Sequence, residues 1–181
     1  MANFIGHRPH GASVQLDYGS LYICTVPLLN GKFHWSLIHI TDAGMATRHH
    51  WAAAGTDPTG RETYVHQALF RGPLTASTTQ ILGYFKVSAY QTRAVIQHDL
   101  DGFRAVCSTV FPQSYPTAEE NRKHGMSCRT WVTSVLLGLG LAREQACEIE
   151  QLVTSRSQSC ETRYLRSFLN DEPYQLVIEE I

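Results

Sequence analysis

Residues 32–40, KFHWSLIHI, decide the fold of this chain. The stretch is rich in aromatic and β-branched residues and contains neither glycine nor proline, which predicts a β-strand. Turn sequences stand on both sides of it, NG at residues 30–31 and TDAG at residues 41–44. We therefore expect a hairpin in which residues 45–52 return as the neighbouring strand.

Other segments outward from this hairpin have recognisable patterns. Residues 14–27 are expected to hold a first strand or a short helix, and the further predicted strands are 64–70, 81–87 and 174–181. Helical periodicity begins after Ser88, which is expected to cap a helix that runs to Cys107. Further helices are predicted at 129–139, 142–154 and 161–170. Strands followed by helices indicate an α+β fold, with an antiparallel sheet packed against the helix that bears Cys128.

Composition narrows the class of protein. Hydrophobic residues make up 43% of the 181 residues and charged residues 17%, which is typical of a globular chain. Lys and Arg number 15 against 16 Asp and Glu, so the chain lacks the dense basic stripe that a nucleic-acid partner requires. We expect residues 1–13 to be a leader arm and residues 14–181 to be a single catalytic-type domain.

The expected location is cytoplasmic. The N-terminus has no apolar stretch of signal-peptide length, and no segment is long enough to span a membrane, so no membrane partner is expected. The five cysteines, at positions 24, 107, 128, 147 and 160, are odd in number and irregularly spaced. A secreted disulfide framework is normally even, so reduced thiols are expected.

Cys128 is the cysteine in a setting that favours chemistry. It follows Gly125, where the chain can turn, and Ser127, a good helix N-cap residue, and an apolar helix is predicted behind it. The unpaired N–H groups at a helix N-terminus lower the pKa of a thiol and so favour the nucleophilic thiolate. The alternative is that Cys128 only fills space in the core, as buried free cysteines often do.

A nucleophilic cysteine needs a base that is itself oriented by a third polar group. His34, on the rigid predicted strand, is the candidate base. Across the hairpin it should face His49 or His50, and the register decides which, because a slip of one residue reverses the faces. Each of these histidines also has a purely structural interpretation. His34 would only pack beside Trp35, and His49 and His50 would be polar residues at the end of a strand.

The order of these motifs resembles the circularly permuted branch of the papain-like superfamily, in which the histidine strand precedes the cysteine helix. Its best-known members, the lecithin-retinol acyltransferase-like enzymes, carry H-W-A on a strand and N-C-E-H-F-V at a helix start. GKFHWSLIHI and GMSCRTWVTSVL are also similar to a family of small fungal proteins with an H-W strand and a G-C-R-[FY]-W helix start. The resemblance covers about residues 30–140.

The resemblance implies a role for each matching residue. Cys128 would be the nucleophile, His34 the base, and His50, or failing it His49, the group that orients the base. The backbone N–H of Cys128 would supply part of an oxyanion hole. The sequence departs from the pattern at Arg129, which is not an acid, and at His50, where the fungal proteins more often carry an acid. Tyr115 and Arg129 are the candidates for the missing oxyanion donor.

These residues together favour thiol-dependent acyl transfer, hydrolysis or cyclisation of a small molecule. The fungal resemblance implies a place in a biosynthetic pathway. The expected substrate-binding residues are Trp35, Tyr115, Arg129 and Trp131. One alternative is a non-covalent cyclase or isomerase that uses His34, His50 and Tyr115 for acid–base work, and another is a ligand-binding module without turnover.

No cofactor or metal is expected. The histidine pairs at 7 and 10 and at 49 and 50 do not have the fixed spacing of a zinc site.

Overall fold

The structure, a computed structural model, describes residues 13–28, 31–53, 59–69, 74–75, 81–90 and 100–181. The strands are β1 (Ser13–Val14), β2 (Ser20–Pro27), β3 (Phe33–Ile40), β4 (Ala46–Ala53), β5 (Glu62–Leu69), β6 (Leu74–Thr75), β7 (Gly83–Lys86) and β8 (Val177–Glu180). The helices are η1 (Ser88–Tyr90), α1 (Leu100–Thr109), α2 (Ala118–Lys123), α3 (Cys128–Gly138) and α4 (Arg143–Leu169). All but the last residue of the expected leader arm lies outside the described residues.

The described residues confirm the α+β class and correct the expected antiparallel sheet. A six-stranded sheet runs in the order β5-β4-β3-β2-β7-β8. Its neighbours are antiparallel except β7 and β8, which pair in parallel, so the sheet is mixed. The long α4 between these strands explains the difference, because it returns the chain to the starting end of β7. Strands β1 and β6 pair separately.

The decisive hairpin forms where it was predicted. Strands β3 and β4 pair from Ile40 with Ala46 to Leu37 with His49, and Gly44 in the turn has a positive φ of 75°, which suits glycine. The register also decides between the two adjacent histidines. His50 shares the sheet face of His34, whereas His49 lies on the opposite face with Leu37.

The helices confirm some predicted boundaries and correct others. Helix α3 begins beside Ser127 as expected. The two helices predicted at 142–154 and 161–170 are one continuous helix, α4, because the serine-rich segment between them contains no glycine or proline to stop it. Ser88 opens only a short 3-10 turn, and residues 91–99 lie outside the described residues. Helix α2 was not predicted.

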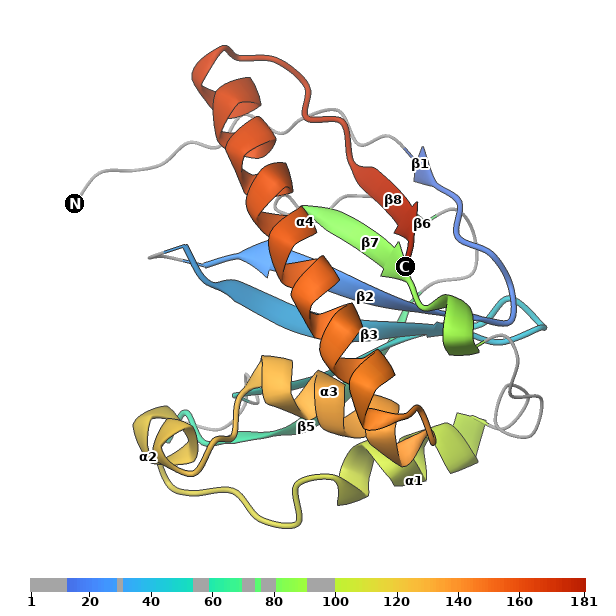
Figure 1. Cartoon of the computed structure of the whole chain (residues 1–181), viewed down its shortest axis with the longest axis vertical. Helices are drawn as coiled ribbons and strands as arrows, with labels where there is room; N and C mark the ends of the chain where they lie inside the picture. Colours follow the sequence, from blue (N-terminus) through green and yellow to red (C-terminus); the bar gives the residue numbers. More distant parts are fainter. Residues whose placement is uncertain (1–12, 29–30, 54–58, 70–73, 76–80, 91–99) are drawn as a thin grey trace.

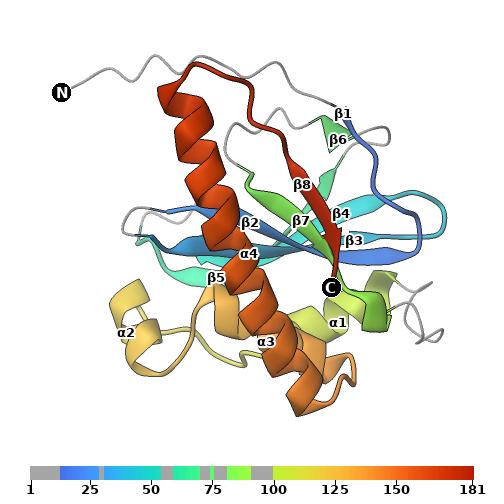
Figure 2. The same ribbon diagram turned by 45° about the horizontal axis from the view of Figure 1, so that its top comes forward.

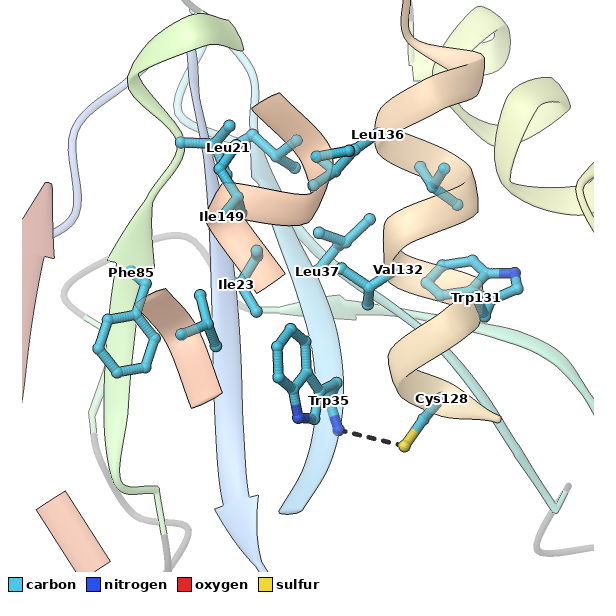
Figure 3. Close-up of a cluster of buried hydrophobic side chains, with 14 of the residues drawn as sticks. Leu21, Ile23, Trp35, Leu37, Phe85, Cys128, Trp131, Val132, Leu136 and Ile149 are labelled. Atoms are coloured by element: carbon cyan, nitrogen blue, oxygen red, sulfur yellow. Dashed lines mark hydrogen bonds between the residues drawn. The ribbon is translucent and has the colours of Figure 1, made fainter. Parts of the chain in front are cut away.

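The main core lies between the sheet and helices α1, α3 and α4. In Figures 1 and 2, α1, α2 and α3 lie at the opposite end of the molecule from β1 and β6, and α4 crosses the sheet. Figure 3 shows much of the buried core, including Leu21, Ile23, Trp35, Leu37, Phe85, Trp131, Val132, Leu136 and Ile149. Phe103 also belongs to this core. A smaller apolar cluster around Tyr22, Ile38 and Tyr84 covers the other sheet face. No helix in the described ranges has the length and apolar character needed to cross a membrane.

Candidate active site

Cys128 is the first residue of α3, and the turn before it is well fixed. The Ser127 hydroxyl accepts a hydrogen bond from the backbone N–H of Thr130, and the Thr130 hydroxyl accepts one from the N–H of Ser127, which completes a capping box. Gly125 adopts a positive φ of 71°, so the sharp turn before the helix suits glycine. The sequence signals at Gly125 and Ser127 are thus confirmed.

The sulfur of Cys128 rests against the backbone of β3 on either side of His34. The N–H of Trp35 donates to Sγ at 3.5 Å (Figure 3), and the thiol donates to the carbonyl of Phe33 at 3.8 Å. These backbone groups are available because the pairing of β3 with β4 ends at Leu37. The sulfur therefore takes the place of a strand neighbour where the two strands separate.

His34 and His50 form a hydrogen-bonded pair across the same separation. Nε2 of His34 lies 2.9 Å from Nδ1 of His50, and the rings meet edge to face. Burial lowers the pKa of both imidazoles to about 4, and the positive charge of Arg48 lowers both further. Both rings are therefore neutral near pH 7. When Nε2 of His34 donates to His50, its Nδ1 is unprotonated, which is the form that a base needs.

The thiol and the imidazole approach the strand from different sides. His34 and His50 point to the sheet face opposite α3, whereas Cys128 reaches the strand edge from the helix side. Among the described contacts of these residues there is no hydrogen bond between Sγ and the His34 ring. Proton transfer from Cys128 to His34 therefore requires a bridging water or a change of rotamer.

The expected lowering of the Cys128 pKa is not observed. Burial raises the pKa of the thiol, and this outweighs the opposing effects of the Trp35 N–H, the Arg122 charge and the Arg129 N–H. The helix N-terminus favours the thiolate, but the free energy needed to bury a charged sulfur away from water is larger than this stabilisation. Cys128 in the free protein is a neutral thiol near pH 7.

This protonation state predicts slow alkylation. We expect iodoacetamide to modify Cys128 much more slowly than the exposed Cys147 near pH 7, because only the thiolate reacts. The rate at Cys128 should increase about tenfold per pH unit up to at least about pH 9. Peptide mass mapping measures both sites in one sample. A fast reaction at Cys128 that levels off near about pH 6 would contradict the neutral thiol.

A partly buried ion pair holds the segment that precedes α3 against β5. The Glu62 carboxylate accepts two hydrogen bonds from the Arg122 guanidinium, at 2.6 and 2.8 Å, and one from the Asn121 amide at 3.0 Å. Arg122 also donates to the carbonyl of Met126, next to the helix cap, and Ser114 donates to the backbone carbonyl of Glu62. Sequence analysis missed this network, because an acid at the start of a strand gives no signal that it is buried.

The expected substrate-binding residues are not gathered at one surface. Trp35 and Trp131 are 2% and 0% exposed, so a ligand would reach either indole only if the core opened. Arg129 forms an ion pair with Glu150 of α4 at 3.2 Å. Tyr115 stacks on His124, with ring centroids 4.0 Å apart. A role in substrate binding stays a prediction for all four residues.

A second cluster of buried histidines lies on the helix side of the sheet. His39 Nε2 lies 3.0 Å from the Tyr90 hydroxyl, and His49 Nδ1 lies 2.7 Å from the Tyr64 hydroxyl. The other ring nitrogens of both histidines are buried without a hydrogen-bond partner in the described part of the chain. Phe103 stacks on the His39 ring. From the sequence, His39 and His49 were considered as metal ligands, and His49 also as the alternative to His50 for orienting His34. The described residues contain no group of three potential metal ligands.

The chain was compared with family models, curated proteins and solved structures. None of them matches. The permuted papain-like arrangement is therefore an expectation from the motifs, and the geometry around Cys128 and His34 has to support any function by itself.

Proposed function

We propose that this protein catalyses thiol-dependent acyl transfer on a small molecule, with Cys128 as nucleophile, His34 as base and His50 as the residue that orients the base. One observation supports this most: the sulfur is held by the two backbone groups that flank His34, while His34 is hydrogen-bonded to His50 at 2.9 Å. The proposed nucleophile thus contacts the backbone of the strand that carries the proposed base, and the proposed orienting group lies on the next strand.

The proposed reaction begins with a neutral thiol. Sγ attacks the carbonyl carbon of an ester or thioester while its proton passes to Nδ1 of His34, and the backbone N–H of Cys128 stabilises the oxyanion. The carbon–leaving-group bond then breaks, and His34 returns the proton to the leaving group. The acyl group on Cys128 is released to water or to a second nucleophile, which again gives its proton to His34.

Acylation by a simple ester tests this proposal. With p-nitrophenyl acetate we expect release of p-nitrophenolate and an acetyl adduct on the peptide that contains Cys128. Cys128→Ala should abolish the adduct, and His34→Gln should slow its formation by about a hundredfold or more, since general-base catalysis is typically worth that much. Cys147→Ala, at an exposed cysteine, is the control and should not alter the rate. An unchanged acylation rate in His34→Gln would contradict the assigned base.

A second candidate is acid–base catalysis without a covalent intermediate. The raised pKa of Cys128 and its hydrogen bonds to the β3 backbone favour it, because a sulfur with these properties can serve structure alone. His34 and His50 would then move protons on a bound substrate to cyclise or isomerise it. Under this alternative Cys128→Ala retains turnover, while His34→Gln loses it.

A further inference from the structure

Arg48 lies on the same sheet face as the histidine pair and has no acidic partner among the described residues. It precedes His50 by two residues on β4 and stands opposite Ile38, so its side chain shares the face of His34 and His50. Its charge lowers the pKa of both imidazoles, which places the guanidinium near them. In the described part of the chain no carboxylate lies within ion-pair distance of Arg48, which is partly buried.

Two other described cations, Arg122 and Lys86, are paired with acids. Arg122, which also acts on His34, is bound by both oxygens of Glu62. Lys86 forms an ion pair with Asp17 at 2.7 Å. The charge of Arg48 beside the histidine pair thus has no acidic partner in the described ranges, and partial burial makes its field stronger than that of a surface arginine.

The Arg48 side chain is also held in position. Its Nε–H donates to the hydroxyl of Ser36 at 3.2 Å, and this hydroxyl donates to the carbonyl of Cys24 at 3.5 Å. Ser36 is fully buried. Nε is engaged, and among the described residues the terminal N–H groups of the guanidinium have no acceptor. Planar donors of this kind bind a carboxylate through two parallel hydrogen bonds.

We propose that Arg48 binds a carboxylate of the substrate beside the His34–His50 pair, so that the protein acts on small organic acids. The assignment of this anion as substrate rests on the function proposed above, but its binding does not require Cys128. The carboxylate anchors the molecule on the sheet face that carries Arg48, and its reacting group extends from there toward His34, where the pairing of β3 with β4 ends.

Binding of benzoate compared with benzamide tests this proposal. The probes have nearly the same shape, and only benzoate is charged. Nitrogen-15 spectra of the imidazole rings should show saturable shifts of His34 and His50 with benzoate and none with benzamide. Because an anion offsets the charge of Arg48, bound benzoate should also raise the pKa of His34. The same result in Cys128→Ala separates this binding from the covalent chemistry.

Three variants identify the group that binds. Arg48→Gln should weaken benzoate binding by about tenfold or more. Arg48→Lys retains the charge without the planar donors, so its affinity for benzoate should lie between those of Arg48→Gln and the unsubstituted protein. Arg156→Gln removes a cation on α4 that pairs with Glu179 of β8. This variant should leave benzoate binding unchanged. Thermal melts confirm that each variant is folded. Equal responses to benzoate and benzamide, or unchanged binding in a folded Arg48→Gln, would overturn the proposal.

Discussion

Glu62→Gln should destabilise the protein by about 3 kcal/mol. The Glu62 side chain is 11% exposed and accepts three hydrogen bonds from Arg122 and Asn121. The amide retains the size of the carboxylate, but it carries no charge and turns a donor toward the guanidinium. The charge of the partly buried Arg122 then has no anion to pair with in this network. Urea unfolding measures the loss, and the melting temperature should decrease by about 6 to 10 °C.

The ion pair between Arg129 and Glu150 provides a matched control. Its side chains are 51% and 29% exposed, so Glu150→Gln should cost at most about 1 kcal/mol. Both pairs join arginine to glutamate near the start of α3, and they differ in the burial of the glutamate and in the number of hydrogen bonds that it accepts. The Glu62→Gln variant should also label faster at Cys128, because Arg122 holds the backbone next to the helix cap. Equal losses in the two variants would show that the buried network does not stabilise this segment.

Acidification should also destabilise the protein strongly. Burial lowers the pKa of His39 to about 4 and that of His49 to about 3, from an ordinary value of 6.5. Below about pH 6.5 these imidazoles bind protons in the unfolded chain but stay neutral in the folded protein. The free energy of unfolding is therefore highest above this pH and decreases as the pH falls toward 4. At about pH 5 each histidine should account for about 2 kcal/mol of lost stability. Urea unfolding between about pH 7 and pH 4.5 measures the slope.

Neighbouring groups reinforce this expectation, and a variant tests it. Arg104 and His66 lie close enough to His49 to lower its pKa further, whereas Asp42 acts in the opposite direction on His39. The double variant His39→Asn/His49→Asn will be less stable near pH 7, but its stability should vary less with pH. His34 and His50 remain and should preserve part of the slope. A slope equal to that of the unsubstituted protein would mean that His39 and His49 do not control acid unfolding.

Local signals in the sequence were sufficient for the hairpin and for the start of the cysteine helix. An aromatic strand between two turn sequences indicated the hairpin, and Gly125 and Ser127 marked the helix cap, whereas the register that selects His50 came from the structure. The parallel pairing of β8 depends on where α4 delivers the chain, and no local pattern contains that information. The continuity of α4 was missed because serine-rich segments were read as breaks, although serine at Ser157 is buried and hydrogen-bonded to Thr25.

The sequence predicted part of the geometry of the candidate site but not its electrostatics. Strand parity and hairpin chemistry bring His34 and His50 to one face, and the order of motifs points to Cys128. The direction of the thiol pKa could not be predicted, because it depends on how deeply the sulfur is buried against β3. The same holds for Glu62 and Arg48. Their significance lies in which charges are paired and which are not, and only the tertiary structure determines this.

The two parts of the candidate site differ in how far apart they lie along the chain. His34 and His50 are separated by 16 residues and meet when a single hairpin closes, whereas the sulfur contact joins positions 93 residues apart. Short loops close quickly and at a small entropic cost, and distant contacts form later in folding. The histidine pair can therefore be in place before Cys128 arrives. Folding intermediates in which the cysteine helix has not yet docked would contain a base without its nucleophile.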